Sequence, residues 1–224
     1  MIEVIDIHKR YYTDHGMGPW VLSGVNLCIP SGVSVGLVGG NGAGKSTLLR
    51  IIGGVDYPSK GEVRRHCHVS WPMGFGGGLQ GSMTGRQNTK FVARIHGMEK
   101  DIPRILERVQ NFSEIGAAFD RPIKTYSSGM KSRLQFGLSL AFDFDVYISD
   151  EVTAAGDKAF QAKAAKAFQD KVGQASVIMV SHSESTLKKF CQAGIWLHGG
   201  QAHWFDKIDE ALRAYHDSIS VSSS

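Results

Sequence analysis

The sequence predicts an α/β fold, in which short buried strands alternate with helices, and three observations support this prediction. Residues 33–38 form a β-branched run that leads into a glycine-rich segment, after which an apolar helical pattern begins. Two further runs, VYIS at 146–149 and SVIMV at 176–180, have the composition of fully buried strands. Apolar residues recur at helical spacing through residues 86–118. Strands and helices in this order favour a sheet covered by helices.

Length and composition exclude several classes of protein. The 224 residues suffice for one domain with an inserted lobe, and 42% hydrophobic with 21% charged residues excludes wholesale disorder. A net charge of +4 is too small to indicate nucleic-acid binding. Three widely spaced cysteines offer no disulfide framework, which favours a reducing compartment. No apolar run approaches the ~20 residues that span a bilayer, so we do not expect the chain to cross a membrane by itself.

The other elements follow from local periodicity and turn residues. We expect strands at 2–7 and 21–29, a helix at 129–142, a hairpin at 196–205 and a final helix capped by Asp206. Residues 55–62 and 73–86 are expected to be loops, and the many glycines of the second indicate a mobile one. Residues 221–224 are expected to be a frayed tail.

A phosphate-binding pattern, G-x-x-x-x-G-K-[ST], lies between a predicted strand and a predicted helix. It consists of Gly39, Gly40, Asn41, Gly42, Ala43, Gly44, Lys45, Ser46 and Thr47. In this context the glycines let successive backbone N–H groups surround phosphates, and the helix N-terminus adds a partial positive charge. Lys45 then reaches the β- and γ-phosphates, and Ser46 is a ligand for Mg²⁺. A glycine turn without a ligand is the alternative, but the strand before it and the helix after it favour nucleoside triphosphate binding.

Three further segments carry residues suited to nucleotide chemistry. Asp150 and Glu151 end a buried strand, where the first suits a Mg²⁺ contact and the second suits polarising an attacking water. A pair of strand-capping acids is the alternative. Ser127 precedes a helix whose free N–H groups suit an anion, although an ordinary N-cap explains it equally well. His182 follows a short strand, and a lone histidine is more often structural than functional.

In order and spacing, these segments resemble the nucleotide-binding domain of ATP-binding cassette (ABC) transporters, and the resemblance covers nearly the whole chain. It implies ATP hydrolysis with Mg²⁺ on a RecA-like mixed sheet with flanking helices, an N-terminal antiparallel β part and an inserted α-helical subdomain. The implied division has a nucleotide-binding core at 1–84 and 126–205, a helical subdomain at 85–125, and a C-terminal helix and tail at 206–224.

The resemblance also implies roles for individual residues. Tyr11 sits where the family has its adenine-stacking aromatic residue, with a buried edge-strand tyrosine as the alternative. The ATP contacts of the Walker A loop are Gly39, Asn41, Gly42, Ala43, Gly44, Lys45, Ser46 and Thr47, and Lys45 is also catalytic. Asp150 is the Walker B acid and a Mg²⁺ ligand beside Ser46, Glu151 resembles the catalytic base, and His182 is the switch histidine.

Other implied roles belong to a head-to-tail homodimer, in which each ATP lies between one chain's Walker A loop and the other chain's signature motif. Ser127, Ser128 and Gly129 occupy that motif, which reads YSSGM where the family commonly has LSGGQ. Asp157 occupies the position of the D-loop aspartate. The family's Q-loop glutamine should fall near residues 74–76, which are Gly, Phe and Gly. Gln80 either replaces it, as an ATP and Mg²⁺ contact, or faces solvent.

Within the family, residues 41–61, 70–88, 150–157 and 204–216 resemble the ATP-binding subunit of bacterial capsular polysaccharide exporters. This implies transport of a lipid-linked polysaccharide and a peripheral position on the cytoplasmic face of the inner membrane. The implied partners are two copies of a separate transmembrane permease and, through it, periplasmic and outer-membrane export components. An O-antigen or teichoic acid exporter is the alternative. Less favoured are a soluble cassette ATPase acting on ribosomes or DNA, and a phosphate-loop kinase or switch GTPase.

Overall fold

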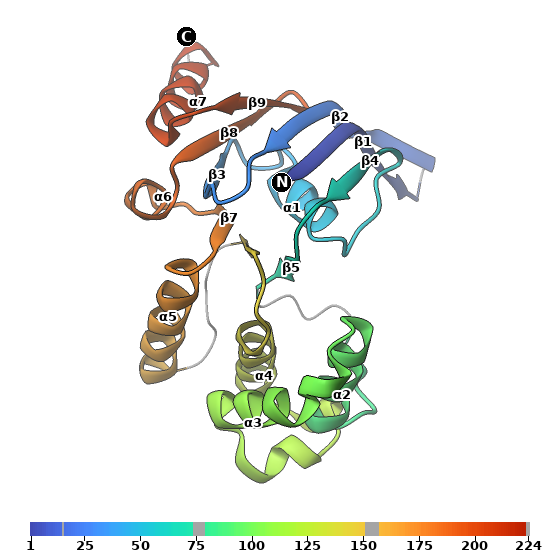
Figure 1. The fold of residues 1–224 in the computed structure, drawn as a ribbon. Helices are drawn as coiled ribbons and strands as arrows, with labels where there is room; N and C mark the ends of the chain where they lie inside the picture. The colour runs from blue at the N-terminus through green and yellow to red at the C-terminus, as the bar shows by residue number, and fades with distance from the viewer. Residues whose placement is uncertain (15, 74–78, 151–156, 223–224) are drawn as a thin grey trace. The chain divides into compact units, whose positions relative to one another are not determined.

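The computed structural model describes residues 1–14, 16–73, 79–150 and 157–222, and it confirms the α/β fold with an antiparallel N-terminal sheet and a mixed sheet (Figure 1). The chain forms two compact units. The first comprises the described parts of Met1–Pro72, Phe144–Glu151 and Gln174–Ser224, and the second comprises those of Met73–Asp143 and Val152–Gly173. The functional division into a core and a helical subdomain at 85–125 stays a prediction.

A three-stranded antiparallel sheet opens the first unit. Its strands are β1 (Ile2–Thr13), β2 (Gly16–Ile29) and β4 (Lys60–Arg65), in the order β2-β1-β4. The alternation predicted for residues 2–7 holds as far as Ile5, with Ile2 and Val4 inside. At Asp6, which has φ +48° and lies within a register shift against β2, the alternation breaks, and Ile7 is the next buried residue. The loop predicted at 55–62 is wrong in its last three residues, because β4 begins at Lys60 and pairs along β1.

A six-stranded mixed sheet forms the centre of the first unit. Its strands, in spatial order, are β5 (Val69–Pro72), β6 (Val146–Asp150), β7 (Ser176–Val180), β3 (Val35–Val38), β8 (Ala193–His198) and β9 (Gln201–Phe205). The first five are parallel, and the predicted β8–β9 hairpin adds the antiparallel edge. Parallel strands buried on both faces explain the continuous apolar runs of the sequence.

Helix α1 (Lys45–Ile52) joins the two sheets into one core. Leu48, Leu49, Ile51 and Ile52 are fully buried and belong to the same apolar cluster as residues of β1, β2, β3, β6, β7 and β8. Burial of four aliphatic side chains, each worth about 2 kcal/mol, fixes the helix firmly. The position of its first turn, after β3 and the glycine-rich segment, is therefore fixed as well.

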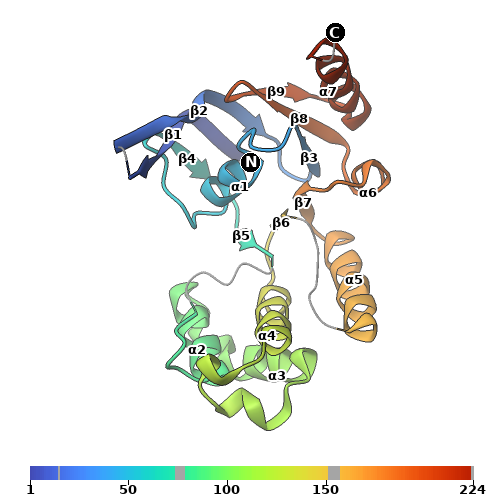
Figure 2. The same ribbon diagram turned by 180° about the vertical axis from the view of Figure 1, so that it is seen from behind.

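Two more helices complete the first unit: α6 (Glu184–Phe190) and α7 (Ile208–Ser222). Figure 2 shows α7 beside β8 and β9, and the approach is close, since a Cβ at Gly194 would lie 2.4 Å from the Cβ of Ala211. The predicted cap of α7 is wrong: the helix begins at Ile208, and the Asp206 carboxylate accepts a hydrogen bond from Trp204 Nε1 at 2.8 Å. The helix also reaches Ser222, into the segment expected to fray.

The second unit is built mainly from α2 (Gly85–Ile95), α3 (Ile102–Ser113), α4 (Ser128–Ala141) and α5 (Lys158–Val172). Thr84 starts α2 with a capping box, in which its side chain accepts from the Gln87 N–H and the Gln87 side chain accepts from the Thr84 N–H. The glycine-rich loop therefore ends at Thr84. Residues 74–78 of that loop lie outside the described residues, so its predicted mobility stays a prediction.

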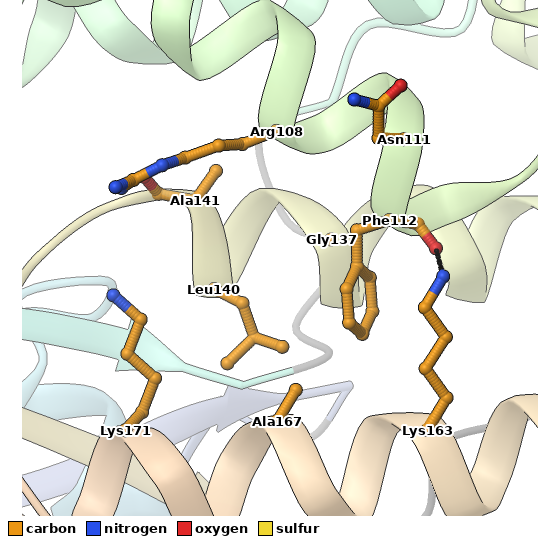
Figure 3. Close-up of a pocket in the computed structure, with 9 residues that line it drawn as sticks. All are labelled: Arg108, Asn111, Phe112, Gly137, Leu140, Ala141, Lys163, Ala167 and Lys171. Carbon is orange, nitrogen blue, oxygen red and sulfur yellow. Dashed lines mark hydrogen bonds between the residues drawn. The ribbon is translucent and has the colours of Figure 1, made fainter.

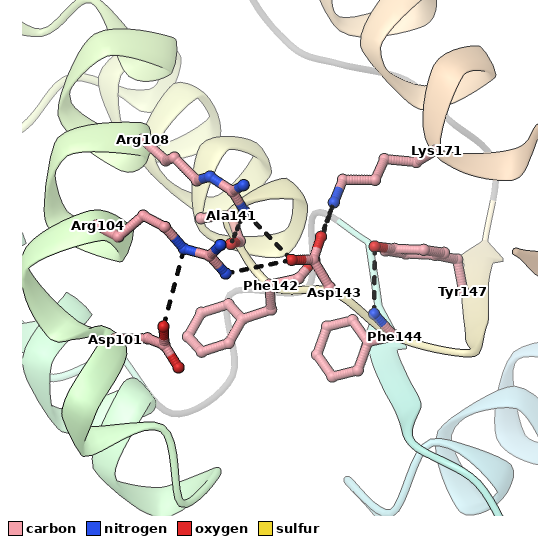
Figure 4. A network of polar contacts seen from close by, with 9 residues as sticks. All are labelled: Asp101, Arg104, Arg108, Ala141, Phe142, Asp143, Phe144, Tyr147 and Lys171. Carbon is pink, nitrogen blue, oxygen red and sulfur yellow. Dashed lines mark hydrogen bonds and ion pairs between the residues drawn. The ribbon is translucent and has the colours of Figure 1, made fainter. Parts of the chain in front are cut away.

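Helices α3, α4 and α5 enclose a cavity of about 490 Å³ (Figure 3). Phe112, Leu140 and Ala167 point into it from the three helices, and Arg108, Lys163 and Lys171 lie around these apolar side chains. The basic side chains are engaged: Lys163 donates to Phe112 O and Glu114, and Arg108 and Lys171 both bind Asp143 (Figure 4). Arg108 and Lys171 also donate to the carbonyls of Ala141 and Phe142, so they cap the C-terminal end of α4.

Among the helices in the described part of the chain, none combines the length and apolar character needed to cross a membrane.

Candidate nucleotide-binding site

The glycine-rich segment connects the end of β3 to α1, as the sequence predicts, and its backbone requires glycine at both ends. Gly39 has φ +152° and Gly44 has φ +99°, values that side-chain-bearing residues rarely adopt. A Cβ at Gly39 would lie 2.5 Å from Leu197 O, and one at Gly44 would lie 2.9 Å from Leu22 Cδ2. Only glycine therefore gives this loop both its shape and its distance from β8 and β2.

The first turn of α1 presents backbone N–H groups rather than a side-chain cap. Gly44 is the N-cap residue and makes no side-chain hydrogen bond. The Lys45 ammonium folds over the loop, donating to Gly39 O at 2.7 Å and Gly40 O at 2.9 Å. Helix N-termini of this kind, with a lysine ammonium close by, attract anions such as phosphate.

Parallel strands β6 and β7 bring two more predicted residues to the same edge of the sheet. Asp150 is paired with Val180 at the end of β7, and His182 follows two residues later. A cavity of about 330 Å³ lies there, lined by Val21, Asn41, Gly42, Gly44, Lys45, Ser46, Thr47, Asp150, Val180 and His182. Ligands of open α/β sheets bind at the carboxyl ends of the strands, so this cavity is the candidate site.

The cavity offers a place for a divalent cation as well as for phosphates. Ser46 and Asp150 both line it, and their side chains carry hydroxyl and carboxylate oxygens, which are ligands that Mg²⁺ prefers. The donor set therefore fits the predicted ion. Glu151, the predicted catalytic base, lies outside the described residues, so its placement stays a prediction.

Tyr11 extends from β1 toward the first turn of α1. Its hydroxyl lies 3.4 Å from Thr47 Oγ1 and donates to Asp56 Oδ2 at 3.0 Å. The side chain is not the buried edge-strand tyrosine considered as an alternative, because it is 41% exposed. Its place beside the phosphate loop is compatible with stacking on a nucleotide base, a role that stays a prediction.

The remaining predicted site residues belong to the second unit. Ser127 is the N-cap of α4, and its hydroxyl accepts from the Met130 N–H at 3.2 Å; Ser128 and Gly129 begin the helix. Asp157 is the N-cap of α5, accepting from the Phe160 N–H at 2.9 Å and pairing with Arg133 at 2.6 Å. Both contacts are those of ordinary capping residues, so roles in a dimer stay predictions.

Gln80 is anchored through its backbone. Its N–H donates to Asn88 Oδ1 at 2.8 Å, and its carbonyl accepts from Asn88 Nδ2 at 3.1 Å, while its side chain is exposed. Asn88 itself is fully buried in α2. This pairing fixes the chain direction at the end of the glycine-rich loop. It neither supports nor excludes the contact with ATP and Mg²⁺ that the sequence analysis considered.

Several residues near the site were not predicted from the sequence. Val21 lines the main cavity from β2. A second cavity of about 150 Å³ is lined partly by Lys45 and His182 and partly by Leu212 and Tyr215 of α7. Such residues reach the site through strand pairing or helix packing, and no local pattern in the sequence marks them. Asp56, which contacts Tyr11, was likewise not predicted from the sequence.

The fold and the site together define a class: an α/β protein that binds a nucleoside triphosphate through a phosphate loop. The chain belongs to the ABC transporter family, whose model matches residues 22–154. Family membership makes it an ATP-hydrolysing protein of the cassette type.

Two relatives match over almost their whole length. The polysialic acid transport ATP-binding protein KpsT of Escherichia coli is 48% identical over 221 residues, covering 98% of this chain and 100% of KpsT. The capsule polysaccharide export ATP-binding protein CtrD of Neisseria meningitidis serogroup B is 42% identical, covering 96% and 99%. Among solved structures, the cassette MJ0796, in a dimeric post-hydrolysis state with ADP and Pi, has a TM-score of 0.69 at 20% identity, covering 93% and 99%. The last comparison concerns the fold alone.

Proposed function

We propose that this chain is the ATP-hydrolysing subunit of a bacterial exporter that moves lipid-linked capsular polysaccharide across the inner membrane. The observation that carries the proposal is the strand-edge cavity, in which Lys45, Asp150 and His182 share the phosphate loop's pocket. The substrate class is supported by full-length similarity to KpsT and CtrD, whose names state polysialic acid transport and capsule polysaccharide export.

In this proposal, the phosphate loop and Lys45 bind the β- and γ-phosphates and stabilise the charge that develops during phosphoryl transfer. Ser46 and Asp150 hold Mg²⁺, which when bound neutralises phosphate charge. Glu151 orients the attacking water and accepts its proton. His182 donates a hydrogen bond to the γ-phosphate from the end of β7. Tyr11 stacks on the adenine.

The working unit in this proposal is a homodimer with two copies of a transmembrane permease at the cytoplasmic face of the inner membrane. Ser127, Ser128 and Gly129 of one chain complete the ATP site of the other, and Asp157 lies at the dimer contact. Gln80 takes the place of the Q-loop glutamine, within the glycine-rich loop that would transmit the ATP state to the permease. Periplasmic and outer-membrane components would be reached through the permease.

The test uses the native complex, purified through a tag on this chain, with its membrane partner identified and its ATP hydrolysis measured. We expect a polysaccharide-export permease and an activity that Glu151→Gln reduces at least ~100-fold, because an amide cannot accept the proton of water. ATP binding should persist in that variant. Isolation of an O-antigen or teichoic acid permease would select the alternative substrate, and unchanged turnover in Glu151→Gln would remove Glu151 from the mechanism.

A further inference from the structure

A polar cluster fixes the phenol of Tyr11 against helix α1. Its hydroxyl donates to Asp56 Oδ2 at 3.0 Å and lies 3.4 Å from Thr47 Oγ1. Asp56 is separated from Tyr11 by 45 residues, so the fold alone brings these side chains together. The two contacts hold the far end of the ring, while β1 holds its backbone.

Asp56 is itself held on its other oxygen. Asp56 Oδ1 accepts from Lys9 Nζ at 2.7 Å and from the Tyr57 N–H at 2.7 Å, and Lys9 Nζ also donates to Tyr57 O at 2.7 Å. Lys9 is only 9% exposed. Burial by itself would raise the pKa of Asp56, but the hydrogen bonds from Lys9, Tyr11 and Tyr57 lower it below the usual value. The carboxylate is therefore ionised, and both of its oxygens accept hydrogen bonds.

Asp56 also belongs to the same structural element as the phosphate loop. It lies in the turn after α1, where the N–H groups of Val55 and Asp56 donate to Arg50 O at 3.0 and 3.3 Å. The first turn of α1 carries Lys45 and Thr47, and the turn after its last residue carries Asp56. One rigid, buried helix thus sets the distance between the phosphate site and the anchor of Tyr11.

The ring of Tyr11 has one further neighbour. Lys9 Nζ lies 4.7 Å from the ring centroid, which is within the range of a cation–π contact. The same ammonium is bound to Asp56, so the Tyr11 side chain, the Asp56 carboxylate and the Lys9 ammonium all contact one another. Tyr11 as a residue is nevertheless 41% exposed, so part of its surface is available for a planar ligand.

We propose that Asp56 is a positioning residue for nucleotide-base binding: it fixes the phenol of Tyr11 at a set distance from the phosphate loop. This inference rests on the proposed function, because it requires Tyr11 to stack on the base. The ligand class is a purine nucleoside triphosphate whose phosphates are bound at the start of α1. Asp56 acts through Tyr11 and touches no reacting atom.

The test measures dissociation constants for Mg²⁺–ATP and for Mg²⁺–tripolyphosphate, which has the phosphates but no base. Asp56→Asn leaves one acceptor oxygen where Lys9 and Tyr11 now use two. We expect it to weaken ATP binding about 3- to 10-fold, the loss of about one hydrogen bond, with tripolyphosphate within about twofold of wild type. Tyr11→Phe should act in the same way, and the double variant should bind ATP no more weakly than Asp56→Asn alone.

The matched control is Asp209→Asn, which removes an ion pair of similar length with Lys188 (2.9 Å) in the same unit. It should change neither constant. Equal weakening of both ligands by Asp56→Asn would overturn the proposal, because the residue would then act on the phosphate loop or the fold. Additive losses in the double variant would also overturn it, as would a Tyr11→Ala variant that keeps the preference for ATP. If Lys45→Ala leaves tripolyphosphate binding unchanged, the proposed function fails instead.

Discussion

Helices α1 and α4 both begin with a short Gly/Ser-rich segment, but their N-caps differ. At α1 the N-cap is Gly44 in a left-handed conformation, without a side-chain cap. At α4 the N-cap is Ser127 in an extended conformation, and its hydroxyl occupies the Met130 N–H. Without a side-chain cap, the start of α1 is suited to binding an anion already in the isolated chain. At the start of α4, the helix's own side chain already occupies one of the first N–H groups, so an anion there has one donor fewer.

The largest expected effect concerns the ligand at α1. Lys45→Ala removes the ammonium that lies over the loop, and with it a charge-assisted contact to phosphate. We expect ATP affinity to fall about 10- to 100-fold, from the ~1.5–3 kcal/mol that such a hydrogen bond contributes. Isothermal calorimetry measures this affinity. The control is Lys207→Ala, which replaces an exposed lysine before α7. Near-native affinity would mean that the α1 start is not the phosphate site.

The second effect tests the backbone of the same helix start. Gly44→Ala places a Cβ at φ +99°, 2.9 Å from Leu22 Cδ2 and 3.2 Å from Val21 O. We expect a loss of about 2 kcal/mol in the free energy of unfolding, from strain and contact together. Gly42→Ala is the matched control, since its φ is +77° but nothing lies within 4 Å of its added Cβ. It should cost about 1 kcal/mol, and equal losses would show that the contact contributes nothing.

The difference between the two helix starts also shows what the sequence could and could not predict. The β3–loop–α1 unit was predictable because its signals are local: a buried run, glycines and an apolar stripe. Strand β4 was missed because five of its six residues are exposed, and it exists through pairing with β1. The contact between Tyr11 and Asp56 was missed for the same reason. It depends on β1 meeting the turn after α1, and neither residue is unusual in its local sequence.

A third, smaller effect tests the start of α4. Ser127→Ala removes the acceptor of the Met130 N–H, and we expect it to cost up to ~1 kcal/mol in the free energy of unfolding. It should also reduce ATP-dependent dimerisation, measured by sedimentation. Thr84→Ala is the control, because Thr84 caps α2 in the same unit with the same chemistry. If both variants dimerise equally, Ser127 is only a cap, and its place in the signature motif has no bearing on ATP.

The smallest effect concerns the other end of α4, where the Asp143 carboxylate binds Lys171 and Arg108. Burial would raise the pKa of Asp143, but Lys171 and then Arg108 lower it below its usual value. A carboxyl group with a lowered pKa stabilises the folded state above its unfolded pKa of about 3.9, and this stabilisation is lost as the pH falls through the folded value.

We therefore expect Asp143→Asn to lower the thermal midpoint at pH 7, with the difference from wild type closing as the pH falls below about 4. Because Asp143 is 58% exposed, the difference should stay under ~1 kcal/mol. Lys171→Met should show the same closing gap if the pair is responsible. A gap that is constant with pH would mean that Asp143 acts through packing or helix capping rather than through its charge.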